Sequence, residues 1–295
     1  MPPKGTWQLF ANSRCEVGEG PRWNDADNML YWVDIPKGVL YRKSVDTPSD
    51  AFECFSPKVG KIGAFTFYQD RLMLFSEGCR VWTCKFGEVP ELFASLSGHE
   101  TTRFNDVFPD DAGHIFCGVA WVPEKGIAGE LWRFSPEDKT FSLLGQGFDG
   151  MPNGMGVSPD RKTFYFVVSE EHKLYAFSFD EARGVLGNRR VLIHFPANMG
   201  NPDGISVDQQ TGEIAIAFWD GNRLAIFTPD GELKQEYLFP VKKITSAVYT
   251  PQGLFITTGN RPWDDEEFYQ NHAGCVWQQK ENCTTHKNIK NRRKK

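Results

Sequence analysis

Short hydrophobic runs separated by turn residues recur along most of this sequence. The clearest example is the stretch 152–180, in which two aromatic and β-branched runs, Thr163–Val168 and Lys173–Phe179, follow a turn at Ser158–Lys162. A further run, Arg190–Phe195, comes after two glycines. Runs of this length, broken by Pro, Gly, Asp and Ser, predict strands joined by tight turns. Four consecutive strands predict one antiparallel sheet, which is too small to be stable alone.

The same unit recurs, which gives six copies along the chain. The copies open at Gly18, Gly63, Phe104, Pro152, Pro202 and Thr245. Their spacing of about 41 to 50 residues lies in the range of propeller blades. Radially repeated four-stranded sheets give each sheet neighbours to pack against and leave only short edges. The sequence therefore predicts an all-β fold, a six-bladed β-propeller of four-stranded antiparallel sheets.

The predicted domain organisation follows from these repeats. Residues 1–279 are expected to form a single six-bladed domain, and residues 280–295 a basic C-terminal tail. The run Trp7–Phe10 precedes the first copy and is a candidate strand to complete the last sheet. Charge blocks such as Lys287–Lys295 are usually disordered; a nuclear-localisation or nucleic-acid role is the alternative for the tail.

The composition of the chain argues against several classes of function. The net charge of −5 argues against a nucleic-acid partner. No apolar segment reaches the roughly 18 residues that a membrane span needs, and no apolar run follows Met1–Gly5 to make a signal peptide. The seven cysteines, an odd number, then suggest reduced thiols, most of them small core hydrophobes. We expect a cytoplasmic protein without a membrane or nucleic-acid partner, and a monomer, because a closed ring needs no partner for stability.

Two loops are longer than a tight turn. The insertion Trp121–Ala128 lies between two predicted strands of the third copy, and Trp121 and Glu124 are candidates for a lid over the channel mouth. A plain surface loop is the alternative. The second loop, Arg261–His272, is acidic and aromatic and is expected to be solvated.

Four oxygen-bearing side chains stand at equivalent places in different copies. Glu19, Asn105, Asn153 and Asp203 each lie near the start of the first predicted strand. In a propeller the first strand is innermost, so these side chains would converge at one end of the central channel. Each residue taken alone could instead cap its own turn.

A bound cation would explain this convergence. Buried carboxylates that face each other lose hydration and repel, and a divalent ion offsets both costs. Two carboxylates and two amides are oxygen ligands, which select a hard ion. Ca²⁺ is the expected ion, with Mg²⁺ or Mn²⁺ as alternatives. Zn²⁺ is a further alternative, although it more usually recruits His or Cys.

Five motifs, taken together, resemble those of a known family. The segments GEGPRW, LYWVDI, RFNDVFPDDAGHIFCG, PNGMGVSPD and NPDGISVD are similar, in order and spacing, to motifs of the regucalcin/gluconolactonase family, which includes luciferin-regenerating enzyme. The resemblance runs from about Glu16 to Trp277. It implies a six-bladed propeller with one divalent cation in the channel, in a family whose enzymes hydrolyse lactones.

The resemblance also implies roles for individual residues. Glu19, Asn153 and Asp203 correspond to the metal ligands, and Asp203 also to the general base. Arg103 and Asn105 correspond to residues that contact the substrate.

Two departures from the family pattern concern the same region. Val107 follows Asp106 where the family commonly has Gly, and the insertion Trp121–Ala128 matches no relative closely. The pocket shape and the substrate are therefore the points at which this chain is expected to differ from the family.

The expected activity is hydrolysis of a small sugar lactone to the aldonic acid by cation-activated water, as in a gluconolactonase. Asp203 would remove a proton from the attacking water. No G-x-S-x-G motif is present, which disfavours a serine acyl-enzyme. Two alternatives stay open: a non-catalytic, calcium-binding regulatory propeller, and a related aryl-ester or organophosphate hydrolase.

Overall fold

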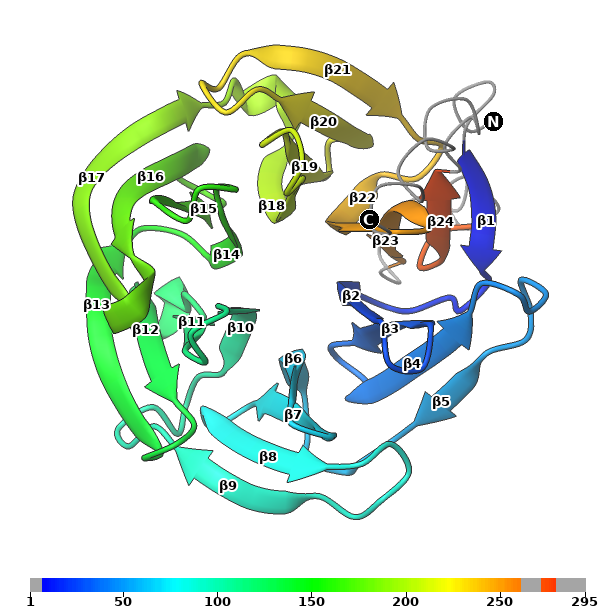
Figure 1. Cartoon of the computed structure of the whole chain (residues 1–295), viewed down its shortest axis with the longest axis horizontal. Coiled ribbons are helices and arrows are strands. Elements are labelled where there is room, and N and C mark those ends of the chain that lie inside the picture. The colour runs from blue at the N-terminus through cyan, green and yellow to red at the C-terminus, as the bar shows by residue number, and fades with distance from the viewer. Residues whose placement is uncertain (1–6, 261–271, 280–295) are drawn as a thin grey trace, which may run out of the picture.

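The computed structural model describes residues 7–260 and 272–279 of the chain. Within them, six four-stranded antiparallel sheets are arranged as a ring (Figure 1). The prediction of a six-bladed β-propeller is therefore confirmed. The basic tail at 280–295 and most of the loop Arg261–His272 lie outside the described residues.

The strands follow one another outward from the axis in five of the six sheets. The first two sheets contain β2 (Gly18–Asn24), β3 (Met29–Asp34), β4 (Val39–Ser44) and β5 (Glu53–Phe55), then β6 (Ile62–Tyr68), β7 (Arg71–Ser76), β8 (Arg80–Cys84) and β9 (Glu91–Ser95). The third and fourth contain β10 (Phe104–Pro109), β11 (Ile115–Val119), β12 (Gly129–Ser135) and β13 (Thr140–Phe148), then β14 (Pro152–Val157), β15 (Thr163–Val168), β16 (Lys173–Asp180) and β17 (Val185–His194). The fifth contains β18 (Asn201–Val207), β19 (Ile214–Trp219), β20 (Arg223–Phe227) and β21 (Leu233–Leu238). Among the described residues, three short 3₁₀ helices lie in the connections: η1 (Pro123–Lys125), η2 (Glu181–Arg183) and η3 (Ala197–Met199).

The sixth sheet closes the ring with strands from both ends of the chain. It contains β22 (Lys243–Thr250), β23 (Gly253–Gly259) and β24 (Val276–Gln279), and its outermost strand is β1 (Trp7–Ala11). The first and last of these strands pair antiparallel, with Trp7 opposite Gln279. The predicted role of the N-terminal apolar run is therefore confirmed.

The hydrophobic core is divided among the interfaces between neighbouring sheets. Each of the six buried clusters draws its side chains from two adjacent blades. Between the third and fourth blades, for example, the rings of Phe116 and Phe164 lie 4.6 Å apart between centroids, and both are fully buried. The aromatic runs noted in the sequence supply these contacts, because a strand that is covered on both faces needs large apolar residues along its whole length.

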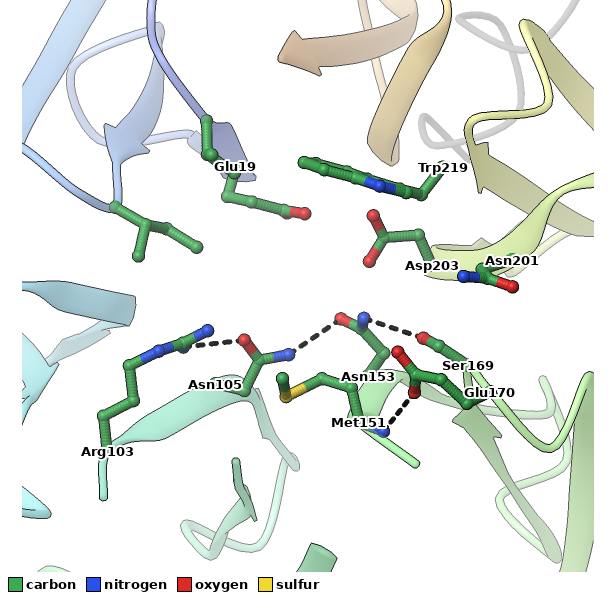
Figure 2. A pocket seen from close by; sticks show the side chains of 12 residues that line it. Glu19, Arg103, Asn105, Met151, Asn153, Ser169, Glu170, Asn201, Asp203 and Trp219 are labelled. Carbon is green, nitrogen blue, oxygen red and sulfur yellow. Dashed lines mark hydrogen bonds between the residues drawn. The ribbon is translucent and has the colours of Figure 1, made fainter. Parts of the chain in front are cut away.

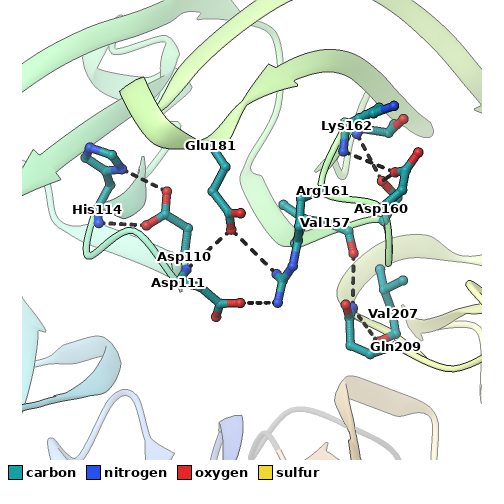
Figure 3. A network of polar contacts seen from close by, with 12 residues as sticks. Asp110, Asp111, His114, Val157, Asp160, Arg161, Lys162, Glu181, Val207 and Gln209 are labelled. Carbon is teal, nitrogen blue, oxygen red and sulfur yellow. Dashed lines mark hydrogen bonds and ion pairs between the residues drawn. The ribbon is translucent and has the colours of Figure 1, made fainter.

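A polar network links the third, fourth and fifth blades at their hairpin turns (Figure 3). Arg161 forms ion pairs with Asp111 and Glu181. Gln209 Nε2 donates to the carbonyl oxygens of Val157 at 3.1 Å and Val207 at 3.2 Å. These turns follow the first strand of each blade, so they lie at the edge of the ring opposite to the strand starts. Partly exposed ion pairs of this kind add little stability.

The insertion Trp121–Ala128 connects β11 to β12, as predicted. It contains η1, and a bridge between Val122 and Ile127 closes it into a compact loop. Among the described residues, no helix has the length and apolar character to cross a membrane.

Candidate functional site

The innermost strand of every blade is irregular near its start. The pairing shifts at Glu19/Arg22 in β2, Ile62/Ala64 in β6, Phe104/Val107 in β10, Pro152/Met155 in β14, Pro202/Ile205 in β18 and Ile244/Ser246 in β22. A bulge of this type re-aims the side chain that it contains. The four predicted oxygen donors lie in or beside such bulges, and Figure 2 shows Glu19, Asn105, Asn153 and Asp203 pointing into a common space. The structure therefore brings them together as the sequence predicted.

Two blades contribute no donor at this position. In β6 the bulged residue is Gly63, where a Cβ would lie only 1.9 Å from the carbonyl oxygen of Phe104. In β22 it is Thr245, whose Oγ1 is hydrogen-bonded to the carbonyl oxygen of Gly18 at 2.5 Å and to Thr257 Oγ1 at 2.9 Å. The donors consequently come from the first, third, fourth and fifth blades.

A cavity of about 250 Å³ opens where these side chains meet; we call it the axial cavity. All five predicted metal-binding and substrate-binding residues line it: Glu19, Arg103, Asn105, Asn153 and Asp203. The candidate lid residues Trp121 and Glu124 do not line it. They line a neighbouring cavity of about 570 Å³, the side cavity, which shares Arg103 and Met151 with the axial one.

The prediction missed several further lining residues. They are Val17, Ile35, Met151, Ser169, Glu170, Asn201 and Trp219. Four of these, Ile35, Ser169, Glu170 and Trp219, lie at or just after the end of the second strand of a blade. Because the first two strands are antiparallel, the end of the second lies beside the start of the first. The residues at the ends of the second predicted strands were therefore a usable signal.

A chain of hydrogen bonds orients the two amide side chains (Figure 2). Arg103 Nη1 donates to Asn105 Oδ1 at 2.7 Å, and Asn105 Nδ2 donates to Asn153 Oδ1 at 3.1 Å. Asn153 Nδ2 in turn donates to Ser169 Oγ at 3.1 Å, and that hydroxyl donates to the carbonyl oxygen of Pro202 at 2.7 Å. One N–H of the Asn153 amide is thus engaged by Ser169 and one lone pair of its oxygen by Asn105, which leaves that oxygen a second lone pair for a ligand in the cavity.

Glu19 is a buried carboxylate in a crowded electrostatic environment. Burial raises the pKa of Glu19 to about 8, and the nearby Asp106 adds to this effect. A hydrogen bond from the Gly20 N–H and the charge of Arg103 oppose it. The charged form of Glu19 is therefore disfavoured unless another positive charge is present.

Asp203 experiences the same two influences more strongly. Burial raises the pKa of Asp203 well above its usual range, and the charges of Glu19, Asp106 and Glu170 raise it further. A hydrogen bond from Asn153 opposes the shift. Two carboxylates from separate blades thus face each other in a cavity that solvates neither fully.

Asp106 lies next to Arg22, and both side chains are half-buried. Burial raises the pKa of Asp106, and the charge of Arg22 opposes this shift. Arg22 also donates to the carbonyl oxygens of Phe65 at 2.6 Å and Val107 at 2.5 Å. The charge of Arg22 stabilises the ionised form of Asp106. It does not contribute to the pKa of Glu19 or Asp203, so the charges of these two carboxylates are not balanced by Arg22.

The donor set suits a hard divalent cation. Glu19 and Asp203 are 9% and 5% exposed, and the amide oxygen of Asn153 faces the same cavity. Oxygen donors of this kind, with uncompensated negative charge, are the ligands that Ca²⁺ and Mg²⁺ take. Among the described residues, no group of three His, Cys, Asp or Glu side chains could hold a metal ion. A cation here would therefore depend on the amide as its third protein ligand.

Comparison with known proteins identifies the same family that the five sequence motifs resemble. Residues 17–260 match the family described as "SMP-30/Gluconolactonase/LRE-like region". The pentonolactonase XacC of Haloferax volcanii is 33% identical over 257 residues, which cover 86% of this chain and 85% of that protein. The L-arabinolactonase of Azospirillum brasilense is 28% identical over 291 residues, covering 93% and 92%.

Comparison of the fold with solved structures leads to the same group of proteins. A crystal structure of the calcium-binding protein regucalcin from Agrobacterium tumefaciens matches with a TM-score of 0.83 at 21% identity, covering 93% of each chain. The resemblance inferred from the sequence motifs is thus confirmed. This chain belongs to the SMP-30/gluconolactonase/LRE family.

Proposed function

We propose that this protein hydrolyses a sugar lactone to the corresponding aldonic acid in the axial cavity, with one divalent cation held by Glu19, Asn153 and Asp203. The observation that carries the proposal is the pair of buried carboxylates, Glu19 and Asp203, which face the same space from separate blades. The names of the lactonase relatives support the reaction class. The calcium-binding relative supports the choice of Ca²⁺ over Mg²⁺, Mn²⁺ or Zn²⁺.

The side chains around the cavity have distinct tasks in this proposal. Arg103 presents guanidinium donors to the hydroxyl groups of the sugar, and Asn105, whose two amide hydrogens are engaged by Pro152 and Asn153, presents the second lone pair of its Oδ1. Figure 2 shows the flat face of the Trp219 indole at the cavity wall, where it can contact the apolar face of the sugar ring. Together these groups hold the lactone carbonyl beside the two carboxylates, and such positioning supplies a large part of the rate.

Proton transfer is assigned to Asp203. The oxygen of a water molecule attacks the lactone carbonyl carbon while the Asp203 carboxylate takes a proton from that water. The bond from the carbonyl carbon to the ring oxygen then breaks, and the ring oxygen receives the proton, which gives the open-chain acid. When bound, the cation supplies Lewis-acid polarisation and keeps the carboxylates ionised.

A substrate panel tests the proposal directly. The purified protein is assayed with pentonolactones, hexonolactones, an aryl ester and a phosphotriester, in EDTA and after addition of Ca²⁺, Mg²⁺, Mn²⁺ or Zn²⁺. We expect sugar lactones to be hydrolysed fastest, with activity lost in EDTA and restored by a divalent ion. Preference for the aryl ester or phosphotriester would favour the related hydrolase function. Calcium binding without turnover of any substrate would favour the regulatory function.

Ser169 is expected to orient Asn153, a proposed ligand of the cation, without contacting the cation itself. Ser169→Ala removes the acceptor that fixes the Asn153 amide, so cation affinity should fall about 10- to 100-fold while the protein stays folded. Calorimetric titration with Ca²⁺ measures the loss, and thermal unfolding checks the fold. Ser158→Ala, at the opposite edge of the same sheet, is the matched control and should bind normally. Unchanged affinity in Ser169→Ala would remove this role.

A further inference from the structure

Hydrogen bonds fix the backbone that forms the base of the side cavity. Its base is the segment 101–103: the Gly78 N–H donates to the carbonyl oxygen of Thr102 at 2.8 Å, and Thr102 Oγ1 donates to that of Ala120 at 3.0 Å. The loop of Trp121–Ala128 covers it, and Lys125 Nζ donates to the carbonyl oxygen of Thr101 at 3.0 Å. The cavity therefore lies between a hydrogen-bonded base and this loop.

Its lining is polar, of mixed charge, with one large aromatic ring. Three acidic and three basic side chains line it besides Arg103: Glu77, Glu100, Glu124, Lys61, Arg80 and Lys125. In the part of the chain that the structure describes, none of these six forms an ion pair with another. The half-buried indole of Trp121 and the thioether of Met151 supply the apolar surface.

This lining suits a neutral ligand with many hydroxyl groups. Hydroxyls donate to carboxylates and accept from ammonium and guanidinium groups, so both charge types find partners. The face of a sugar ring that carries only C–H bonds packs on an indole such as that of Trp121. A multiply charged anion would meet three carboxylates, and a cation would meet four basic groups, Arg103 included, so neither is well complemented.

The sizes of the two cavities point to a ligand that occupies both. Pockets for small molecules usually measure about 300–1,000 Å³. The axial cavity, at about 250 Å³, is below this range, whereas the axial and side cavities together fall within it. Arg103 and Met151 line both, so one molecule can extend past these two residues from the first cavity into the second.

We propose that the side cavity is a subsite for a second sugar residue, so that the preferred substrate is a glycosylated aldonolactone. The lactone ring of a disaccharide-derived lactone occupies the axial cavity, and its glycosyl group lies on Trp121 among the charged side chains. Trp121 and Glu124 are then specificity-determining residues. This inference rests on the lactonase function proposed above.

Steady-state kinetics with paired substrates test the inference. Glucono-1,5-lactone is compared with disaccharide aldonolactones of several linkages, including cellobiono-1,5-lactone, and with 6-phosphogluconolactone. We expect at least one disaccharide lactone to exceed gluconolactone about tenfold in kcat/KM. Trp121→Ala should lower the ratio of the two kcat/KM values about tenfold, mainly through KM, and Trp121→Phe should recover most of it.

A second variant keeps the test valid if Trp121→Ala folds poorly. Glu124→Gln should lower the same ratio severalfold, and Glu137→Gln, an exposed carboxylate on the β12–β13 turn, is the control that should not. Turnover of gluconolactone with slower turnover of every disaccharide lactone would overturn the subsite and leave the proposed function standing. Preference for the phosphorylated lactone would replace the sugar subsite with an anion subsite. No turnover of any lactone would reject both proposals.

Discussion

Asp203→Asn is expected to lower kcat/KM for lactone hydrolysis by at least about 10³-fold. General base catalysis alone contributes about 10²- to 10⁴-fold, and the same substitution removes a charge from the proposed cation site. The amide has nearly the same shape as the carboxylate, so the cavity should keep its form. Kinetics at saturating Ca²⁺, together with a calcium titration, measure both losses.

The stability of this variant provides an independent check. Burial and the neighbouring carboxylates disfavour the charge of Asp203, so the cation-free variant should be at least as stable as the wild type. Asp208→Asn is the matched control, because Asp208 lies after the other end of the same strand and accepts a hydrogen bond from the Gln210 N–H in the turn. A variant Asp203→Asn that kept more than a tenth of the wild-type kcat/KM would contradict the assignment.

The cation-free protein is expected to lose stability as the pH rises, and Ca²⁺ should cancel most of this loss. The pKa of Glu19 is about 8 in the folded chain, against about 4.3 for an unfolded glutamate. The folded state therefore binds more protons than the unfolded state between these values, so the free energy of unfolding falls as the pH rises across that window. A difference of one pKa unit corresponds to about 1.4 kcal/mol, so the effect reaches several kcal/mol.

Urea unfolding at pH 5.5, 7.0 and 8.5, in EDTA and in Ca²⁺, measures this dependence. The gain in stability from Ca²⁺ should grow with pH, because the cation competes with protons for the carboxylates. The variant Glu19→Gln should show a flatter dependence in EDTA, since its side chain does not titrate. Equal slopes for the wild type and Glu19→Gln would show that Glu19 does not hold a proton in the folded protein.

The predictability of the strands from the sequence depends on their distance from the axis. Inner strands such as Thr163–Val168 are covered by both neighbouring blades and carry continuous apolar runs. The outermost strands Glu53–Phe55 and Leu233–Leu238 are mostly exposed and have no clear alternation of buried and exposed residues. These outermost strands are held in the sheet by backbone hydrogen bonds to the neighbouring strand. Such hydrogen bonds leave no hydrophobic pattern in the sequence, so the strands could not be predicted from it.

The candidate site was predictable from strand positions that repeat among the copies, whereas the cavity beside it was not. Glu19 and Asp203 stand at equivalent places in their copies, so comparison of the copies found them. Ser169 and Trp219 reach the cavity from the ends of second strands, a position that also repeats, although their residue types alone do not mark them. The side cavity was beyond prediction, because its walls come from loops of neighbouring blades whose approach depends on the whole ring.

The closure of the ring by β1 has a consequence for the order of folding. This strand leaves the ribosome before any other described strand, and its partner β24 leaves after all of them. The aromatic neighbours on which Trp7 and Phe10 pack, Phe239 and Phe255, also come late in the chain. Contacts so distant along the chain form slowly. The first described strand to be synthesised must therefore wait for the last one before either has a finished sheet to occupy.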